Sequence, residues 1–243
     1  MERGDDRRYN RSMNIDIVDL PQTAAASPAA VVVVIDVLRA ATTAAAAFQA
    51  GASAIIPVSK VREGLELRDR LDGSVTIGEV DGHAVDEFDL PNSPSIVAGE
   101  DLTGRIIVHR TTAGTQGLLH GDAAQLLLMA GFANASATCA RVRAEGSARV
   151  VLVVTGSRSA DRGDEDRACA EYLARTLEGT APDATQFLER VRASAAAQRF
   201  APGGDLVAYA EDVERCTALD TAAFAMVTED IDGLRGLRAR PSS

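Results

Sequence analysis

Tryptophan is absent from the sequence, and aromatic residues make up only 4% of its 243 residues. A core of ordinary size must therefore be built from Val, Ile, Leu and Ala, which suits close packing of helices on parallel strands. Lysine occurs once, at Lys60, and the formal net charge is −10. Because no basic stripe is present, we exclude a general nucleic-acid surface. An anionic substrate needs local compensation from arginine, helix N-termini or a bound cation.

Cysteine and long apolar runs are also scarce. Cys139, Cys169 and Cys216 lack the close spacing of metal ligands, which predicts reduced, buried thiols in a cytoplasmic protein. No segment approaches the roughly 18 apolar residues of a membrane span, so no membrane association is expected. The three histidines share no ligand spacing, which argues against zinc. The glycine-rich nucleotide-binding motifs and the G-x-S-x-G motif of nucleophile-elbow hydrolases are missing as well.

The most informative segment that is present is VVVVIDVLRAATT, residues 31–43. Five apolar β-branched residues, 31–35, have no polar side and predict a central parallel strand covered on both faces. Asp36 and Arg39 follow at once, and an alanine-rich helix is expected over residues 40–50. In open α/β sheets, ligands bind beyond the carboxyl ends of the strands. The two charged residues therefore indicate either a site or a structural salt link.

Strands alternate with helices along most of the chain. This alternation predicts an α/β fold, namely a three-layer, mostly parallel sheet with helices on both faces. Residues 1–13 mix charges without an apolar stretch and predict a disordered extension, which leaves residues 14–243 as a single domain. After residue 180 we expect helices over 184–200, 205–217 and 221–227, either packed on the core or forming a cap.

Polar residues collect just after the predicted strands. The groups are Asp36 with Arg39, then Glu79, the segment 110–115, Asn134 and the segment 158–166. Five such groups in the same topological place favour one shared crevice. Structural alternatives stay open at this point. Asp36 can cap a helix, Arg39 can form an ion pair, residues 111–115 can be a hydroxyl-capped turn, and Glu165 and Asp166 can complement a helix dipole.

Five motifs together resemble a known family. They are IDVLRAATT (35–43), GE (78–79), FDLPNSPS (88–95), TTAGT (111–115) and GSRSADRGDEDRACA (156–170). Their order and spacing are similar to those of the 2-phosphosulfolactate phosphatase family from about residue 14 onward. The resemblance implies an α/β, Mg²⁺-dependent phosphatase that acts on a three-carbon sulfonate phosphomonoester in coenzyme M biosynthesis. The family's motif residues fall on Asp36, Arg39, Glu79, Asp89, Asn92, Ser93, Thr111, Thr112, Gly114, Thr115, Glu165 and Asp166.

The resemblance also suggests a role for each of these positions. We expect Mg²⁺ to be held by carboxylates drawn from Asp36, Glu79, Glu165 and Asp166. Catalysis is assigned to Asp36, Arg39 and Glu79. Binding of the small anionic substrate is assigned to Arg39, Asn92, Ser93, Thr111, Thr112, Gly114 and Thr115. The nucleophile is either a metal-activated water or Asp36, and water is favoured because no second aspartate stands two residues after Asp36.

Three positions depart from the family pattern. Pro91 and Glu171 replace glycines, and Ala113 replaces an asparagine whose amide belongs to the predicted anion-binding turn. Pro91 and Ala113 support an alternative, a non-catalytic module that binds a small sulfonate or phosphate on the same scaffold. A third hypothesis, an isochorismatase-like hydrolase, needs a catalytic lysine, but Lys60 begins a helix that we expect to be exposed. The alanine-rich helices and the resemblance favour a homodimer.

Overall fold

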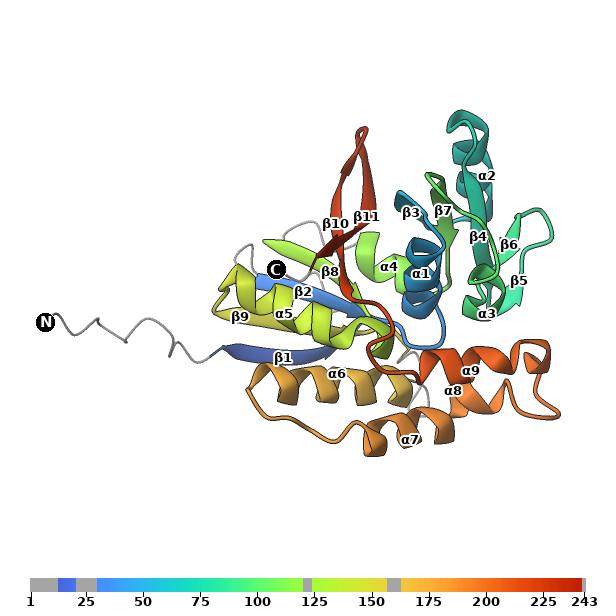
Figure 1. Ribbon diagram of the computed structural model, residues 1–243. Helices are drawn as coiled ribbons and strands as arrows, with labels where there is room; N and C mark the ends of the chain where they lie inside the picture. Colours follow the sequence, from blue (N-terminus) through green and yellow to red (C-terminus); the bar gives the residue numbers. More distant parts are fainter. Residues whose placement is uncertain (1–12, 21–29, 120–123, 157–162, 242–243) are drawn as a thin grey trace, which may run out of the picture.

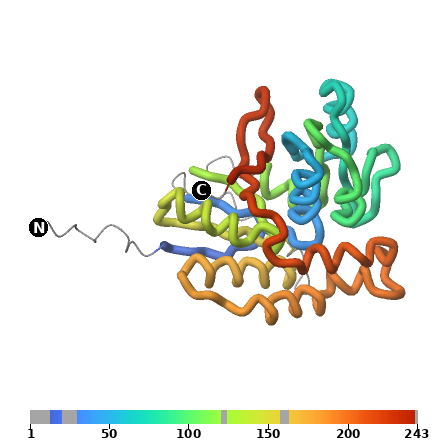
Figure 2. The backbone as a smooth tube through the Cα atoms, in the orientation of Figure 1, coloured from blue at the N-terminus to red at the C-terminus, as the bar shows by residue number. Residues whose placement is uncertain are grey.

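The computed structural model describes residues 13–20, 30–119, 124–156 and 163–241, which form a mostly parallel sheet with helices on both faces (Figures 1 and 2). The strands are β1 (Asn14–Asp19), β2 (Ala30–Ile35), β3 (Ala54–Val58), β4 (Val75–Val80), β5 (His83–Ala84), β6 (Leu90–Pro91), β7 (Ile106–Arg110), β8 (Leu126–Ala130), β9 (Arg149–Val154), β10 (Phe224–Ile231) and β11 (Leu234–Pro241). The helices are α1 (Ala40–Gln49), α2 (Val61–Arg70), α3 (Pro94–Val97), α4 (Gly114–Leu119), η2 (Phe132–Asn134), α5 (Ala135–Glu145), α6 (Asp164–Leu177), α7 (Thr185–Ala193), α8 (Ala195–Gln198), η3 (Val207–Tyr209) and α9 (Glu211–Cys216). The expected three-layer α/β fold is confirmed.

Strand β2 lies inside the parallel part of the sheet, between β9 and β8. Its side chains alternate between two cores. Val32 and Val34 pack in the cluster that contains residues of α1, α3 and α4. Val31, Val33 and Ile35 pack in the cluster formed with α5, α6 and α7. Because both faces are covered, the strand needs no polar side, and the unbroken β-branched run is explained.

The sheet has a second parallel part, β3–β7–β4, which joins the first through an antiparallel hairpin. The hairpin strands β10 and β11 lie between β8 and β3. Asp232 and Gly233 form its two-residue turn with φ values of 53° and 82°, the left-handed conformations that a tight hairpin turn requires. The expected helix over 221–227 is therefore wrong. Met226 packs in one core and its neighbour Val227 in the other, which is the two-residue period of a strand.

The region after residue 180 divides into two parts. Helix α7 packs against α6, since Phe187 and Val191 are buried in the same cluster as the inner face of α6. The long helix expected over 184–200 is interrupted at Ser194, whose extended backbone ends α7 and whose hydroxyl caps α8 by accepting from the Ala197 N–H. Five residues of the following segment line the cavity described below, namely Ala196, Arg199, Phe200, Asp205 and Leu206. Helix α7 therefore packs on the core, as one alternative predicted, whereas the segment that contains α8 borders the cavity.

Residues 1–12 of the expected extension lie outside the described part of the chain, which begins at Met13. In the part of the chain that is described, no helix has both the length and the apolar character needed to cross a membrane.

Candidate active site

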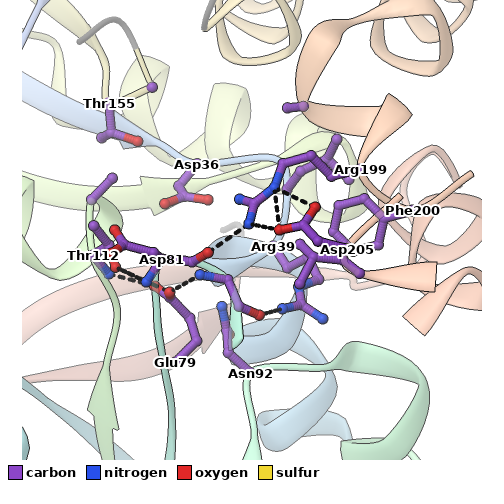
Figure 3. Close-up of a pocket in the computed structure, with 16 residues that line it drawn as sticks. Asp36, Arg39, Glu79, Asp81, Asn92, Thr112, Thr155, Arg199, Phe200 and Asp205 are labelled. Atoms are coloured by element: carbon purple, nitrogen blue, oxygen red, sulfur yellow. Dashed lines mark hydrogen bonds and ion pairs between the residues drawn. The ribbon is translucent and has the colours of Figure 1, made fainter. Parts of the chain in front are cut away.

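A cavity of about 460 Å³ lies at the carboxyl ends of β2, β4 and β9, beside the turn that follows β7 (Figure 3). The C-terminal segment that contains α8 closes one side of it. The lining residues are Asp36, Leu38, Arg39, Glu79, Asp81, Gly82, Asn92, Thr112, Ala113, Thr155, Gly156, Ala196, Arg199, Phe200, Asp205 and Leu206. The cavity is where the strand-end rule places a ligand site in an open α/β sheet.

Asp36 stands at the end of β2, is buried, and faces the cavity (Figure 3). Its Oδ1 accepts from the Ala40 N–H at 3.1 Å, so part of its capacity caps helix α1. The chain passes very close at Gly114, where a Cβ would lie 2.7 Å from Oδ2, so only glycine fits there. Burial raises the pKa of Asp36 to about 6, and the charges of Glu79 and Glu165 act in the same direction. Three carboxylates from distant parts of the sequence therefore act on one another.

Glu165 and Asp166 begin helix α6 and have different surroundings. Asp166 accepts from Val37 N–H at 2.7 Å, Gly156 N–H at 3.0 Å and Thr155 Oγ1 at 3.1 Å, which ties the end of β2 to the end of β9. Glu165 has a buried Oε2 without a hydrogen-bond partner. Burial is the main cause that raises the pKa of both carboxyl groups. Asp166 therefore positions the two strand ends, while Glu165 keeps an unused acceptor.

Glu79 is the hydrogen-bond centre on the opposite side of the cavity. Its Oε1 accepts from the Thr112 N–H. Its Oε2 accepts from the Gly82 N–H and from Thr112 Oγ1, the latter at 3.0 Å. The carboxylate thereby joins the turn after β4 to the segment after β7. Both of its oxygens have protein donors, so its first role is to hold these two loops together.

Arg39 forms a buried ion pair. Its Nη1 lies 2.8 Å from Asp212 Oδ2, its Nη2 donates to Gly82 O at 2.6 Å, and its side chain is 2% exposed. The guanidinium also lies against Phe200 and Tyr209, 5.1 and 4.7 Å from the ring centroids. The structure therefore contains the salt link that was one of the two interpretations of Arg39. The same residue still lines the cavity.

Two other expected substrate ligands lie in the loop 92–93. Asn92 lines the cavity, and its Oδ1 is 3.1 Å from His109 Nε2. Burial lowers the pKa of His109 to about 4, so its ring is neutral near pH 7. Ser93 is fully buried and donates to Asp212 Oδ1 at 2.8 Å, so it contacts the partner of Arg39 and is not among the lining residues.

The turn 111–115 is largely engaged with itself. Thr115 Oγ1 donates to Thr111 O at 2.8 Å, and Thr115 N–H donates to Thr111 Oγ1 at 2.9 Å. Of this turn, Thr112 and Ala113 line the cavity, and the amide of Gly114 interacts with Asp36. Thr111 and Thr115 are not among the lining residues, and their hydrogen bonds to each other stabilise the turn.

The structure brings four of the five predicted polar groups together. Asn134 is the exception, because its amide bonds to Gly131 N–H and Met129 O in its own turn. Residues 158 and 161 lie outside the described part of the chain. Sequence reasoning missed Arg199, Asp205 and Asp212, which come from the C-terminal segment. No local motif marks them, because each has a partner at least 117 positions away in the sequence.

A model of the 2-phosphosulpholactate phosphatase family matches residues 16–230. The chain belongs to this family. A protein of Bacillus subtilis is 35% identical over 181 residues, 74% of this chain and 78% of the relative. A protein of Thermotoga petrophila is 30% identical over 212 residues, 80% and 86% of the two chains. One of Thermoplasma acidophilum is 30% identical over 140 residues, 58% and 62%. Each relative is named a probable 2-phosphosulfolactate phosphatase.

For this member of the 2-phosphosulfolactate phosphatase family, the carboxylates of the cavity can be compared with the oxygen ligands that Mg²⁺ requires. Among the described residues, no three His, Cys, Asp or Glu side chains are grouped closely enough to enclose a metal ion. Mg²⁺ does not need such an enclosure, since it usually binds one or two carboxylates and keeps waters and substrate oxygens. Asp36 has an oxygen facing the cavity, and Glu165 has an oxygen without a partner. These two carboxylates fit the ion better than Glu79 and Asp166, because both oxygens of Glu79 and both oxygens of Asp166 accept hydrogen bonds from the protein.

The cysteines of this 2-phosphosulfolactate phosphatase family member confirm the expectation of buried thiols. Cys139, Cys169 and Cys216 are free and buried. Burial raises the pKa of Cys139 and Cys216 to about 12, and that of Cys169 well above its usual value. A thiol held in its protonated form is a poor nucleophile, so the cysteines take no part in the site.

Proposed function

We propose that this chain is a Mg²⁺-dependent phosphatase that hydrolyses 2-phosphosulfolactate to sulfolactate and phosphate. The family match and the names of the relatives support the reaction. The observation that carries the metal dependence is the pair Asp36 and Glu165: both carboxylates are buried, Asp36 lines the cavity, and Glu165 has an oxygen without a hydrogen-bond partner among the described residues. Burying such charges is unfavourable unless a cation or a proton compensates them.

In the proposed mechanism, Asp36 and Glu165 would hold Mg²⁺, and the ion would supply Lewis-acid chemistry for a water molecule and for the phosphate oxygens. A water oxygen forms a bond to phosphorus while the phosphorus–oxygen ester bond breaks. The ester oxygen leaves with the electron pair and takes up, in net terms, the proton that the attacking water loses. Asp166 keeps the ends of β2 and β9 in fixed positions during this exchange, and Glu79 does the same for the loops opposite. Catalysis then depends mainly on positioning and electrostatic stabilisation.

Steady-state assays test the proposal. We expect release of phosphate from 2-phosphosulfolactate in the presence of Mg²⁺, no release with excess EDTA, and recovery when Mg²⁺ is restored. A generic aryl phosphate serves as a second substrate. Absence of turnover on both esters, combined with thermal stabilisation by inorganic phosphate, would instead support the non-catalytic anion-binding module.

The identity of the nucleophile has its own experiment. We propose attack by water because Asp36 already caps α1 and has no second aspartate two residues on. A reaction with ³²P-labelled substrate, quenched in acid within one turnover, is expected to leave no label on the protein. Acid-stable label at Asp36 would assign the aspartyl-phosphate route.

The proposal extends to the setting of the reaction. On the family resemblance, we place the enzyme in coenzyme M biosynthesis, in the cytoplasm, as a homodimer. Light scattering coupled to size-exclusion chromatography, at concentrations from micromolar down to tens of nanomolar, measures the mass of the assembly directly.

A further inference from the structure

Of the two arginines among the described lining residues, Arg199 is the more accessible. Its side chain is 38% exposed, whereas that of Arg39 is 2% exposed and lies between two aromatic rings. Arg39 is also paired with the buried Asp212. An incoming anion can therefore reach Arg199 without breaking buried contacts, but it cannot reach most of Arg39.

The guanidinium of Arg199 is held in a defined orientation. Its Nε lies 3.1 and 3.2 Å from the two oxygens of Asp205, and its Nη2 donates to Asp205 Oδ2 at 2.6 Å and to Asp81 O at 2.7 Å. Within the described part of the chain Nη1 makes no hydrogen bond, so its two N–H groups remain available there. Figure 3 shows the guanidinium extending across the cavity toward Asp36. The available donors are thus fixed on the side where Asp36 stands.

The charge balance of the cavity calls for such a cation. Among its described lining residues, the carboxylates are Asp36, Glu79, Asp81 and Asp205, and the cations are Arg39 and Arg199. The charge of Arg39 is matched by Asp212, outside the lining. A phosphomonoester dianion approaching these carboxylates needs compensation beyond the metal, and the free edge of an arginine suits phosphate oxygens.

We infer that Arg199 contacts the phosphoryl oxygens of the substrate, opposite Asp36, as a further catalytic residue. The inference rests on the proposed function. Asp205 would be a positioning residue that holds the Nε and Nη2 edge and leaves Nη1 to the substrate. Its ion pair with Arg199 lies at the surface, 47% exposed on the carboxylate side, so it contributes little to stability and its loss should not unfold the protein.

Four variants and two esters test the inference in the presence of Mg²⁺. The esters are 2-phosphosulfolactate and 2-phospholactate, which lacks the sulfonate. Arg199→Ala is expected to lower kcat/KM on both by about 100-fold, mainly through kcat, because the contact strengthens as charge develops on the phosphoryl group. Arg199→Lys should recover part of this loss. Asp205→Asn should lose less than about fivefold, since the guanidinium stays in place.

Arg192→Ala is the matched control. Arg192 lies on α7 outside the cavity lining, 4.0 Å from the exposed Glu214, so its removal also deletes one exposed arginine of the C-terminal region. It should retain wild-type kcat/KM. A second readout is independent of turnover: inorganic phosphate with Mg²⁺ should raise the Tm of the wild type and of Arg192→Ala, and raise that of Arg199→Ala much less.

Three results would overturn the inference. They are kcat/KM of Arg199→Ala within twofold of the wild type, a loss confined to the sulfonated ester, or an equal loss in Asp205→Asn. The second would assign Arg199 to the sulfonate, and the third to a purely structural link. If the wild type hydrolyses neither ester, the proposed function fails by itself, and the Tm shift with phosphate then decides for or against the Arg199 contact.

Discussion

The two sides of the cavity treat their carboxylates differently. On the first side, formed by β2, β9 and α6, Asp36 faces the cavity and Glu165 has a buried oxygen without a hydrogen-bond partner in the described part of the chain, whereas Asp166 has protein donors for both oxygens. On the second side, formed by β4, β7 and their loops, both oxygens of Glu79 accept from protein donors. Carboxylates that are close in space can therefore have different roles, according to whether the protein supplies hydrogen-bond donors to their oxygens. The first side suits a cation, and the second side is a frame for the loops.

The largest expected effects come from replacing one carboxylate on each side by its amide. Asp36→Asn is expected to lower kcat/KM a thousandfold or more, at least about 4 kcal/mol, without lowering Tm, because a buried charge repelled by its neighbours is removed. Glu79→Gln should lower Tm by several degrees, because the new NH₂ group would lie against N–H or O–H donors and leave one of them without an acceptor. The expected loss in the free energy of unfolding is about 1–3 kcal/mol. Activity assays and calorimetry measure both. Unfolding of Asp36→Asn, or an unchanged Tm in Glu79→Gln, would contradict the assignment.

Arg39 precedes helix α1, and its ion pair with Asp212 links the end of β2 to α9, so its removal tests how far the frame extends. Arg39→Ala leaves Asp212 buried without its charge partner and is expected to destabilise the protein by about 3–5 kcal/mol. Urea unfolding measures the loss. The double variant Arg39→Met with Asp212→Leu should recover part of it, because no uncompensated charge remains. A loss below about 1 kcal/mol in Arg39→Ala would show that the pair is not structural.

Acid should affect the two sides in opposite directions in the metal-free protein. The pKa of Asp36 is raised to about 6, so its contribution to stability is present at low pH and is lost as pH rises through 6. The pKa of His109 is lowered to about 4, so its contribution is present above about 6.5 and is lost as pH falls toward 4. Each contribution amounts to about 3 kcal/mol at most.

Unfolding free energies from pH 4.5 to 7.5, with EDTA present, separate these two contributions. Relative to the wild type, Asp36→Asn should gain stability progressively as pH rises through 6. His109→Gln should lose less stability than the wild type as pH falls below 6.5. Identical pH slopes for the wild type and both variants would mean that neither group responds as its surroundings suggest.

The smallest expected effect concerns one hydroxyl of the second side. Thr112 Oγ1 donates to Glu79 and accepts from the Asp81 N–H at 2.9 Å, while the Thr112 N–H bonds to Glu79 independently. Thr112→Val should therefore cost only about 1 kcal/mol. Thermal unfolding measures this loss, with Thr112→Ser as the control that keeps the hydroxyl. Equal losses in the two variants would assign the effect to packing of the methyl group.

Sequence reasoning located the first side because its signals are local. The unbroken strand 31–35, the charge that ends it at Asp36 and the acidic start of α6 are each visible within a few residues. Their convergence followed from the geometry of parallel strands, which the structure confirms. The same reasoning could not divide the carboxylates into acceptors with and without donors. That division depends on the amides of Val37, Gly156 and Thr112, which every residue type except proline supplies.

The C-terminal region was predicted poorly for two different reasons. The hairpin had a signal, Asp232-Gly233 between apolar residues, but the alanines near residue 222 favoured a helix. Arg199 had no signal, because an arginine near the end of an expected helix is ordinary until the fold brings it to a cavity. Periodicity predicts which face of an element is buried, but it carries no information about where a loop crosses the molecule.

The insertion of β10 and β11 has a consequence for how the protein is made. These strands join β8 to β3, and they are translated after every other strand. Until residues 224–241 emerge from the ribosome, both sheet parts carry an open edge able to pair with another chain. A nascent chain stalled near residue 220 would thus contain every described lining residue of the cavity. It should nevertheless leave the edges of β8 and β3 unpaired and should be bound by chaperones.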